Sequence, residues 1–227
     1  NSGLEISMKK IKRRVISAAT IGLLLTSIFN VNAEVNETKY FTNDGAVVIE
    51  DNLLEAKKEK RKQLRYMEQK FIALVRSFKN EIINDAENHD IPDFWGECNE
   101  KNLLGPICNL RPEGKRDLYG LCTPTKEGKD TFEYGIGVLV DEQTADFDMA
   151  EMEKAGFCVW DVKPGTYVVF DCIGEDGDCI GETWEKFYKE FLPQMGYEAE
   201  SETDYEIYFE KGREGLMCEL WIPIRKN

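Results

Sequence analysis

An internal repeat in the C-terminal part of the chain constrains the fold more than any other feature. IPDFW at 91–95 is echoed by IGETW at 180–184, and each isoleucine is followed 28 residues later by a tyrosine, Tyr119 and Tyr208. An apolar strand-like run precedes each copy of the motif, at 71–75 and 167–170. A second one ends each copy, at 132–140 and 216–224. The repeat predicts two pseudo-symmetric strand–helix–strand–strand units in tandem.

The second copy shows its periodicity most clearly. Five apolar residues recur at helical spacing, which predicts one buried helix face: Trp184, Phe187, Tyr188, Phe191 and Leu192. Pro193 and Gly196 then favour the end of that helix. The segment 205–210 alternates as a strand does, with Glu206 and Tyr208 on one side and Tyr205 and Ile207 on the other. We therefore expect an α+β fold, a mostly antiparallel sheet with two packed helices.

Three regions follow from the changes in composition along the chain. Residues 1–33 contain a basic start, a fifteen-residue apolar run at 15–29 and a small-residue ending at 31–33, which is the pattern of a secretory signal. The run is shorter than the about 20 residues of a spanning helix, so we expect no stable membrane span. A buried helix or a misassigned start is the alternative for this segment. Residues 34–65 read as a polar lead-in and linker helix, and 66–227 as the main domain.

The seven cysteines suggest a different compartment from the signal-like segment. Their number is odd and none forms a CxxC pair, so neither a zinc ribbon nor a thioredoxin-type redox site is indicated. Several lie in apolar runs, as at 157–159, where a cysteine is expected to be a small buried residue. Unpaired thiols favour the cytoplasm, whereas the N-terminal segment suggests export. The sequence leaves both localisations open.

Charge and composition exclude several functions. The formal net charge is −14; residues 1–33 carry +4 and 34–66 carry zero, so residues 67–227 carry −18. An acidic body of this kind argues against direct nucleic-acid binding, which needs a cationic face. The single histidine, His89, excludes triads and metal sites built on several histidines, and no phosphate-binding loop motif occurs. We expect no cofactor and no metal.

Taken together, the motifs resemble the GyrI-like effector-binding domain, the C-terminal ligand domain of AraC- and MerR-type multidrug-responsive regulators, which also occurs alone in gyrase-inhibitor-like proteins. The resemblance covers about residues 66–227, and the motifs occur in family order. They are IPDFW at 91–95, YG at 119–120, FEYGIGV at 132–138, PGTYVVFDCIG at 164–174, ETWEKFYKEFLPQMGY at 182–197, DYEIYFE at 204–210 and ELWIPI at 219–224. It implies a ligand cleft between the two halves. A signal-like segment stands where the regulators carry a DNA-binding domain.

The resemblance also implies a set of site residues. Family members bind cationic or aromatic drug-like molecules with a glutamate between aromatic side chains, and the matching position is Glu206 in DYEIYFE. The expected aromatic ligand-binding residues are Tyr134, Tyr167, Tyr208 and Trp221. Aromatic faces add cation–π attraction of about 0.5–2 kcal/mol to the carboxylate's charge. Glu133 and Glu219 could add negative potential, whereas Trp95 and Trp184 are expected in the core.

Three functions remain open at this level. The leading hypothesis is a small-molecule binding module rather than an enzyme, acting as an effector sensor or a sequestering protein, with a protein partner possible. A second is a small hydrolase that opens strained electrophilic rings, with Glu206 as general base. Some relatives resemble hydrolases of this kind. The third is an acidic interaction protein like the gyrase-inhibitor-like factors.

Overall fold

The computed structural model describes residues 46–48, 68–84, 89–124, 129–175 and 177–226. The signal-like segment 1–33 lies outside these ranges, as does the predicted lead-in and linker helix at 34–65 except for 46–48. Within the described ranges, no helix combines the length and the apolar character that crossing a membrane requires.

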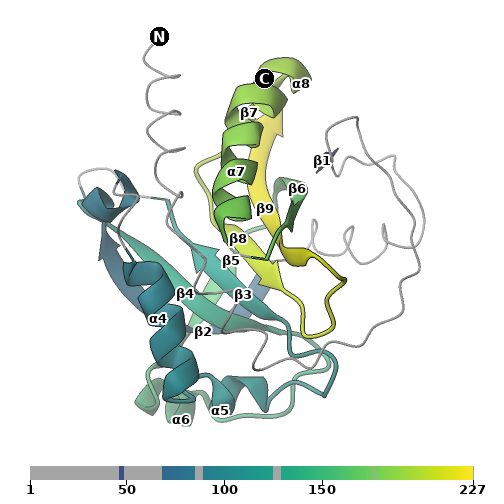
Figure 1. The fold of residues 1–227 in the computed structure, drawn as a ribbon. Helices are drawn as coiled ribbons and strands as arrows, with labels where there is room; N and C mark the ends of the chain where they lie inside the picture. Colours follow the sequence, from purple (N-terminus) through teal and green to yellow (C-terminus); the bar gives the residue numbers. More distant parts are fainter. Residues whose placement is uncertain (1–45, 49–67, 85–88, 125–128, 176, 227) are drawn as a thin grey trace.

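The described strands form one antiparallel sheet (Figure 1). In chain order they are β1 (Ala46–Val48), β2 (Gln69–Lys79), β3 (Leu118–Cys122), β4 (Thr131–Val140), β5 (Phe157–Val162), β6 (Thr166–Ile173), β7 (Tyr197–Ala199), β8 (Asp204–Tyr208) and β9 (Leu216–Lys226). Their order across the sheet is β1-β6-β9-β8-β3-β4-β2-β5, and β7 pairs with the end of β9.

The two repeats form the two halves of this sheet. The first half contains β2, the helix α4 (Asp90–Glu100), β3 and β4; the second contains β6, the helix α7 (Asp178–Lys186), β8 and β9. The halves join where β3 pairs with β8, with Tyr119 opposite Ile207 and Gly120 opposite Glu206. Outward from this junction the first half runs β3, β4, β2 and the second runs β8, β9, β6, so both halves have the same strand order. The predicted α+β fold of tandem strand–helix–strand–strand units is confirmed.

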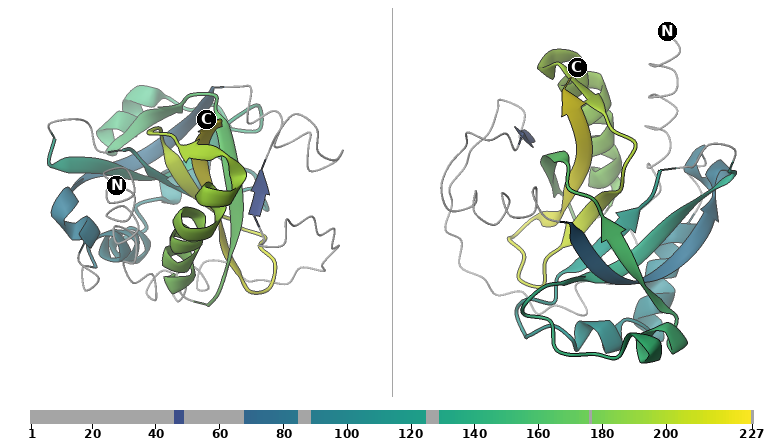
Figure 2. Two further views of the ribbon diagram at one scale, coloured as in Figure 1. Left: turned by 90° about the horizontal axis from the view of Figure 1, so that it is seen from above. Right: turned by 180° about the vertical axis from the view of Figure 1, so that it is seen from behind.

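Both long helices cover the same face of the sheet, called here the helix face. Side chains of α4, such as Phe94 and Trp95, and of α7, such as Ile180 and Trp184, share one buried cluster with alternate residues of the strands. Figure 2 shows α4 beside the first half and α7 beside the second. The chain also forms a 3₁₀ helix (Asn80–Asn84), α5 (Gly105–Cys108) and α6 (Met149–Lys154).

The helical stripe predicted in the second copy is present, but not as one regular helix. After α7 comes a π-helical turn (Phe187–Phe191), followed by α8 (Leu192–Met195). Pro193 stands in the first turn of α8, where proline is tolerated, so it does not end the helix. Gly196 does end it, in the left-handed conformation with φ +68°.

Some features differ from the simple repeat. Strands β1, β5 and β7 lie outside the two units; β5 pairs with β2 and forms an edge of the sheet. Cys158, expected to be buried in its apolar run, is exposed on this edge strand. Tyr119 and Tyr208 lie at the same distance from the start of their repeats but do not occupy equivalent positions in the sheet. Tyr119 packs on the face opposite the helices, whereas Tyr208 packs on the helix face.

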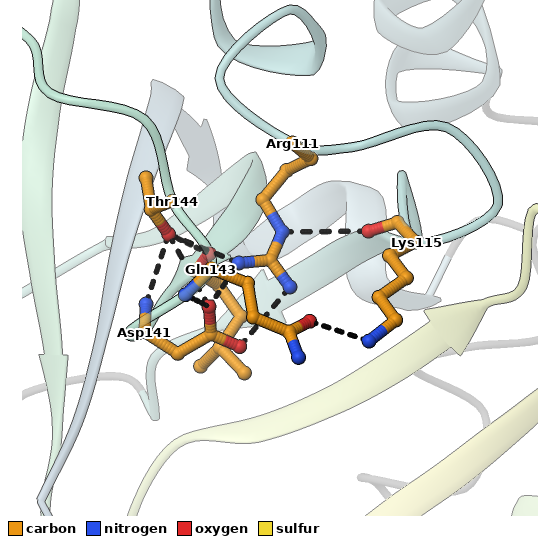
Figure 3. Close-up of polar contacts among 6 residues, drawn as sticks. Arg111, Lys115, Asp141, Gln143 and Thr144 are labelled. Carbon is orange, nitrogen blue, oxygen red and sulfur yellow. Dashed lines mark hydrogen bonds and ion pairs between the residues drawn. The ribbon is translucent and has the colours of Figure 1, made fainter.

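A buried ion pair fixes the loops of the first half (Figure 3). The guanidinium of Arg111 donates to both carboxylate oxygens of Asp141 and, at 3.0 Å, to the hydroxyl of Thr144. Its Nε donates to the carbonyl of Lys115 at 3.3 Å, and the Lys115 ammonium donates to Gln143 at 2.8 Å. The segment between α5 and β3 is thereby tied to the segment after β4.

Candidate functional site

The candidate site is centred on β8, the strand at the junction of the halves. Its residues alternate as predicted: Glu206 and Tyr208 point to the helix face, and Tyr205 and Ile207 to the opposite face. β8 pairs with β3 on one side and with β9 on the other, so Glu206 lies between Gly120 and Leu220. This pairing places a carboxylate in the middle of the sheet, where only 5% of Glu206 is exposed.

A chain of buried hydrogen bonds connects helix α4 to this carboxylate. The indole Nε1 of Trp95 donates to the hydroxyl of Tyr134 at 3.0 Å, and that hydroxyl donates to Oε2 of Glu206 at 2.9 Å. Each hydrogen bond polarises the next one, so two linked hydrogen bonds in a low-dielectric interior are each stronger than they would be alone. The ring of Trp95 also contacts the ring of Tyr208 edge-on, with centroids 5.0 Å apart. Trp95 therefore links strands of both halves.

Gly120 makes this arrangement possible. A Cβ at this position would overlap both Oε2 of Glu206 and the hydroxyl of Tyr134. The missing side chain leaves the room in which the carboxylate and the phenol meet. The requirement here is space, since no positive φ is recorded for Gly120.

Burial and charge act together on Tyr208. Burial raises the pKa of its hydroxyl well above the ordinary value, and the nearby negative charge of Glu206 raises it further. The hydroxyl therefore remains protonated at physiological pH. A ligand reaching this point would meet a neutral phenol beside a carboxylate.

The sequence-predicted site residues do not all come together. Glu206, Tyr208 and Tyr134 lie in the cluster on the helix face, whereas Tyr167 and Trp221 lie in the cluster on the opposite face. Glu219 shares a strand with Trp221 and accepts a hydrogen bond from its indole Nε1 at 3.1 Å. Glu133 is exposed on β4. The predicted set is thus divided between two faces of one sheet.

Sequence reasoning missed two contributors to the Glu206 site. Trp95 is buried, as expected, but it also donates to Tyr134, which its assignment to the core did not include. A buried indole N–H usually needs an acceptor, and that requirement was the available signal. Gly120 was noted only as part of the YG motif at 119–120. Its role depends on strand pairing, which the sequence does not display.

The described residues contain no group of three or more His, Cys, Asp or Glu side chains arranged to hold a metal ion. All seven cysteines, each of which is described, are free thiols. Glu206, Tyr134, Tyr208 and Trp95 supply a carboxylate, two phenols and an indole, which suit binding by charge, hydrogen bonding and aromatic contact.

Comparison with known proteins agrees with this architecture. The family model for integron-associated effector binding proteins, Cass2, matches residues 63–224. The solved structure of SAV2435 bound to tetraphenylphosphonium has a TM-score of 0.54 and 20% identity, covering 70% of this chain and 89% of that one. A structure from Staphylococcus aureus MU50, described as a bacterial transcription regulation protein, has a TM-score of 0.51 and 18% identity, covering 70% of this chain and 94% of that one. A search of curated proteins finds no match.

Fold and family together define a two-halved effector-binding domain with a buried carboxylate at the junction. The family match covers most of the chain, and the chain belongs to the integron-associated effector binding protein family. The GyrI-like resemblance and the expected class, a domain that binds a small-molecule effector, are confirmed by this membership. The two structures share the fold with this chain.

Proposed function

We propose that this domain binds lipophilic organic cations on the helix face, with the Glu206 carboxylate as counter-ion and Tyr134 and Tyr208 as aromatic contacts. The carrying observation is the buried hydrogen-bonded chain from Trp95 through Tyr134 to Glu206 at the junction of the halves. Membership of an effector-binding family and the tetraphenylphosphonium bound by the structural neighbour SAV2435 support the ligand class.

The chemistry of the site favours a bulky, weakly hydrated cation. An ion pair formed away from water is screened less by salt than one on the surface. A strongly hydrated ion such as an ammonium would lose its water shell on entry, whereas a phosphonium or aromatic cation has little to lose. Ring faces add about 0.5–2 kcal/mol of cation–π attraction.

In this proposal the side chain of Trp95 controls ligand access to Glu206. Its ring contacts Tyr208 and its indole N–H donates to the hydroxyl of Tyr134, so it lies against both tyrosines of the proposed site. Glu206, Tyr134, Tyr208 and Trp95 are all buried, so side chains must move before a ligand reaches the carboxylate, and we propose that Trp95 is the one that moves. The free energy of that opening reduces the apparent affinity, as for any binding-competent state that is partly populated.

Calorimetry with tetraphenylphosphonium tests the assignment. In Glu206→Gln we expect the dissociation constant to rise about tenfold or more, which corresponds to about 1.4 kcal/mol or more. Glu133→Gln is the matched control, because it removes the same charge from an exposed position on β4; we expect a change of less than about twofold, since exposed charges are screened. Equal losses in both variants would show that only the general negative field matters.

The hydrolase alternative is separated by a different readout. Incubation with a strained-ring aromatic compound, followed by mass spectrometry, detects the addition of water. Binding without turnover supports the proposed function, whereas turnover that disappears in Glu206→Gln would assign Glu206 the role of general base.

A further inference from the structure

We propose that the face of the sheet opposite the helices holds a second binding site for an organic cation, centred on Glu219. This site is separate from the one proposed around Glu206, so either assignment can fail without the other. The two glutamates lie on neighbouring strands, but Glu219 is opposite Ile207, whose side chain belongs to the face away from the helices.

Glu219 is a buried carboxylate with an aromatic partner. It is 9% exposed and accepts a hydrogen bond from the Trp221 indole at 3.1 Å. Ionised side chains are seldom buried in this way, because removing a carboxylate from water costs several kcal/mol unless other groups compensate. A buried amide, Gln69 on β2, lies on the same face and hydrogen-bonds to Tyr205.

A series of aromatic rings in contact with one another lies on the same face as Glu219. The rings of Tyr205 and Trp221 are stacked with centroids 5.5 Å apart, and Tyr167 lies 5.5 Å from Tyr205 and 6.0 Å from Trp221. The series continues into the first half, where Tyr119 lies 6.3 Å from Tyr205 and 4.9 Å from Phe71. A carboxylate beside several ring faces is the combination that recognises quaternary and aromatic cations.

The electrostatic surroundings of these rings are mostly acidic. Burial raises the pKa of both Tyr119 and Tyr205, and the negative charge of Glu219 raises each further. The charges of Asp204, Glu202 and Glu200 likewise add to the effect of burial on Tyr167. Asp117 and Asp141 act on Tyr119 in the same sense, with Arg111 opposing them. A cation entering this cluster would encounter negative potential from both halves.

The composition of this cluster sets it apart from ordinary core. Every residue of the buried cluster on this face comes from a strand, and six of its members are aromatic: Phe71, Tyr119, Trp160, Tyr167, Tyr205 and Trp221. Among the described residues, no helix contributes to it, whereas α4 and α7 both pack on the other face.

The four tryptophans allow the two faces to be observed separately. Trp160 and Trp221 lie on the face of Glu219, and Trp95 and Trp184 lie on the helix face. The test measures tryptophan quenching and calorimetry with tetraphenylphosphonium and with ethidium. It uses full-length wild type, Glu206→Gln, Glu219→Gln, the double variant, and Trp221→Phe as a second probe of the site.

We expect Glu206→Gln to retain one class of binding that quenches Trp221, and Glu219→Gln to weaken that class about tenfold or more. Trp221→Phe should remove most of the associated quenching. Circular dichroism and thermal unfolding check that each variant is folded. Loss of all binding in Glu206→Gln alone, or an unchanged Trp221 signal with both probes at millimolar concentration, overturns the second site. The first of these outcomes leaves the site at Glu206 supported.

Discussion

Trp95 and Trp184 occupy matching places in the two repeats but make different contacts. The side chain of Trp95 on α4 donates a hydrogen bond to Tyr134, and its ring contacts the ring of Tyr208. These two tyrosines belong to different halves. Trp184 stacks on Tyr188 at 5.8 Å, with the rings 22° apart, and meets Phe187 edge-on, so its recorded ring contacts lie within its own helical segment. The scaffold is therefore repeated in both halves, whereas the two helix tryptophans differ: Trp95 contacts strands of both halves around Glu206, and the ring contacts of Trp184 stay within its own helical segment.

The same contrast holds for the arginine–aspartate pairs of the halves. Arg111 and Asp141 in the first half have side chains 7% and 25% exposed, whereas Arg213 and Asp171 in the second half are 40% and 21% exposed. A pair held away from water is coupled more strongly to the fold than one that water can reach. The half that supplies Trp95 is thus also the half with the more buried ion pair.

The largest effect should come from removing that pair. We expect Arg111→Ala to lower the free energy of unfolding by about 3 kcal/mol, because Asp141 loses its main partner. Arg213→Ala should cost less than about 1 kcal/mol, as for other exposed pairs. Urea unfolding of both variants measures the difference, and equal losses would contradict this comparison of the halves.

The next largest effect concerns Gly120 at the junction. In Gly120→Ala the new methyl group overlaps Glu206 and Tyr134, and we expect a loss of about 1–3 kcal/mol in stability together with weaker tetraphenylphosphonium binding. Gly212→Ala is the control, since the atom nearest to its added Cβ is 3.8 Å away. Thermal unfolding and calorimetry report the two effects; a tolerated alanine at 120 would show that the carboxylate and phenol need not meet.

Exchanging each tryptophan for phenylalanine tests their asymmetry directly. Trp95→Phe removes the hydrogen bond to Tyr134, which contributes about 1 kcal/mol to stability. It also places a smaller ring against Tyr208. Stopped-flow measurement should show faster association of tetraphenylphosphonium with Trp95→Phe and an unchanged rate with Trp184→Phe. Identical rates in both variants would mean that Trp95 does not control entry.

The smallest effect is a pH dependence in the first half. Burial acts to raise the pKa of Asp141, but hydrogen bonding and charge from Arg111 outweigh it and hold the pKa below the ordinary value of 3.8. Stability from this lowered pKa is present above the unfolded value and is lost as the pH falls through the folded one. The stability gap between wild type and Asp141→Asn should therefore narrow below about pH 4 in urea titrations, and a constant gap would contradict the coupling.

The sequence predicts the scaffold better than the site, for physical reasons that individual residues illustrate. Periodicity reports which face a residue occupies within one element, so the alternation of 205–208 and the stripe from Trp184 were readable. Periodicity does not report which strands are neighbours, and the role of Gly120 exists only through its pairing with Glu206. For the same reason the sequence grouped Tyr167 and Trp221 with Glu206, although their side chains point to the opposite face of the sheet.

The exposure of Cys158 provides a chemical handle on the molecule. Five cysteines are buried and Cys108 is half-buried, so Cys158 on the edge strand β5 is the accessible thiol. Burial raises its pKa, as does the charge of Glu133, so maleimide coupling should be run at mildly alkaline pH. Cys158 alternates in phase with Trp160, which places a label on the face that carries Glu219. A dye attached there, close to Trp160, would report events on that face through a change in its own emission, with no residue substituted.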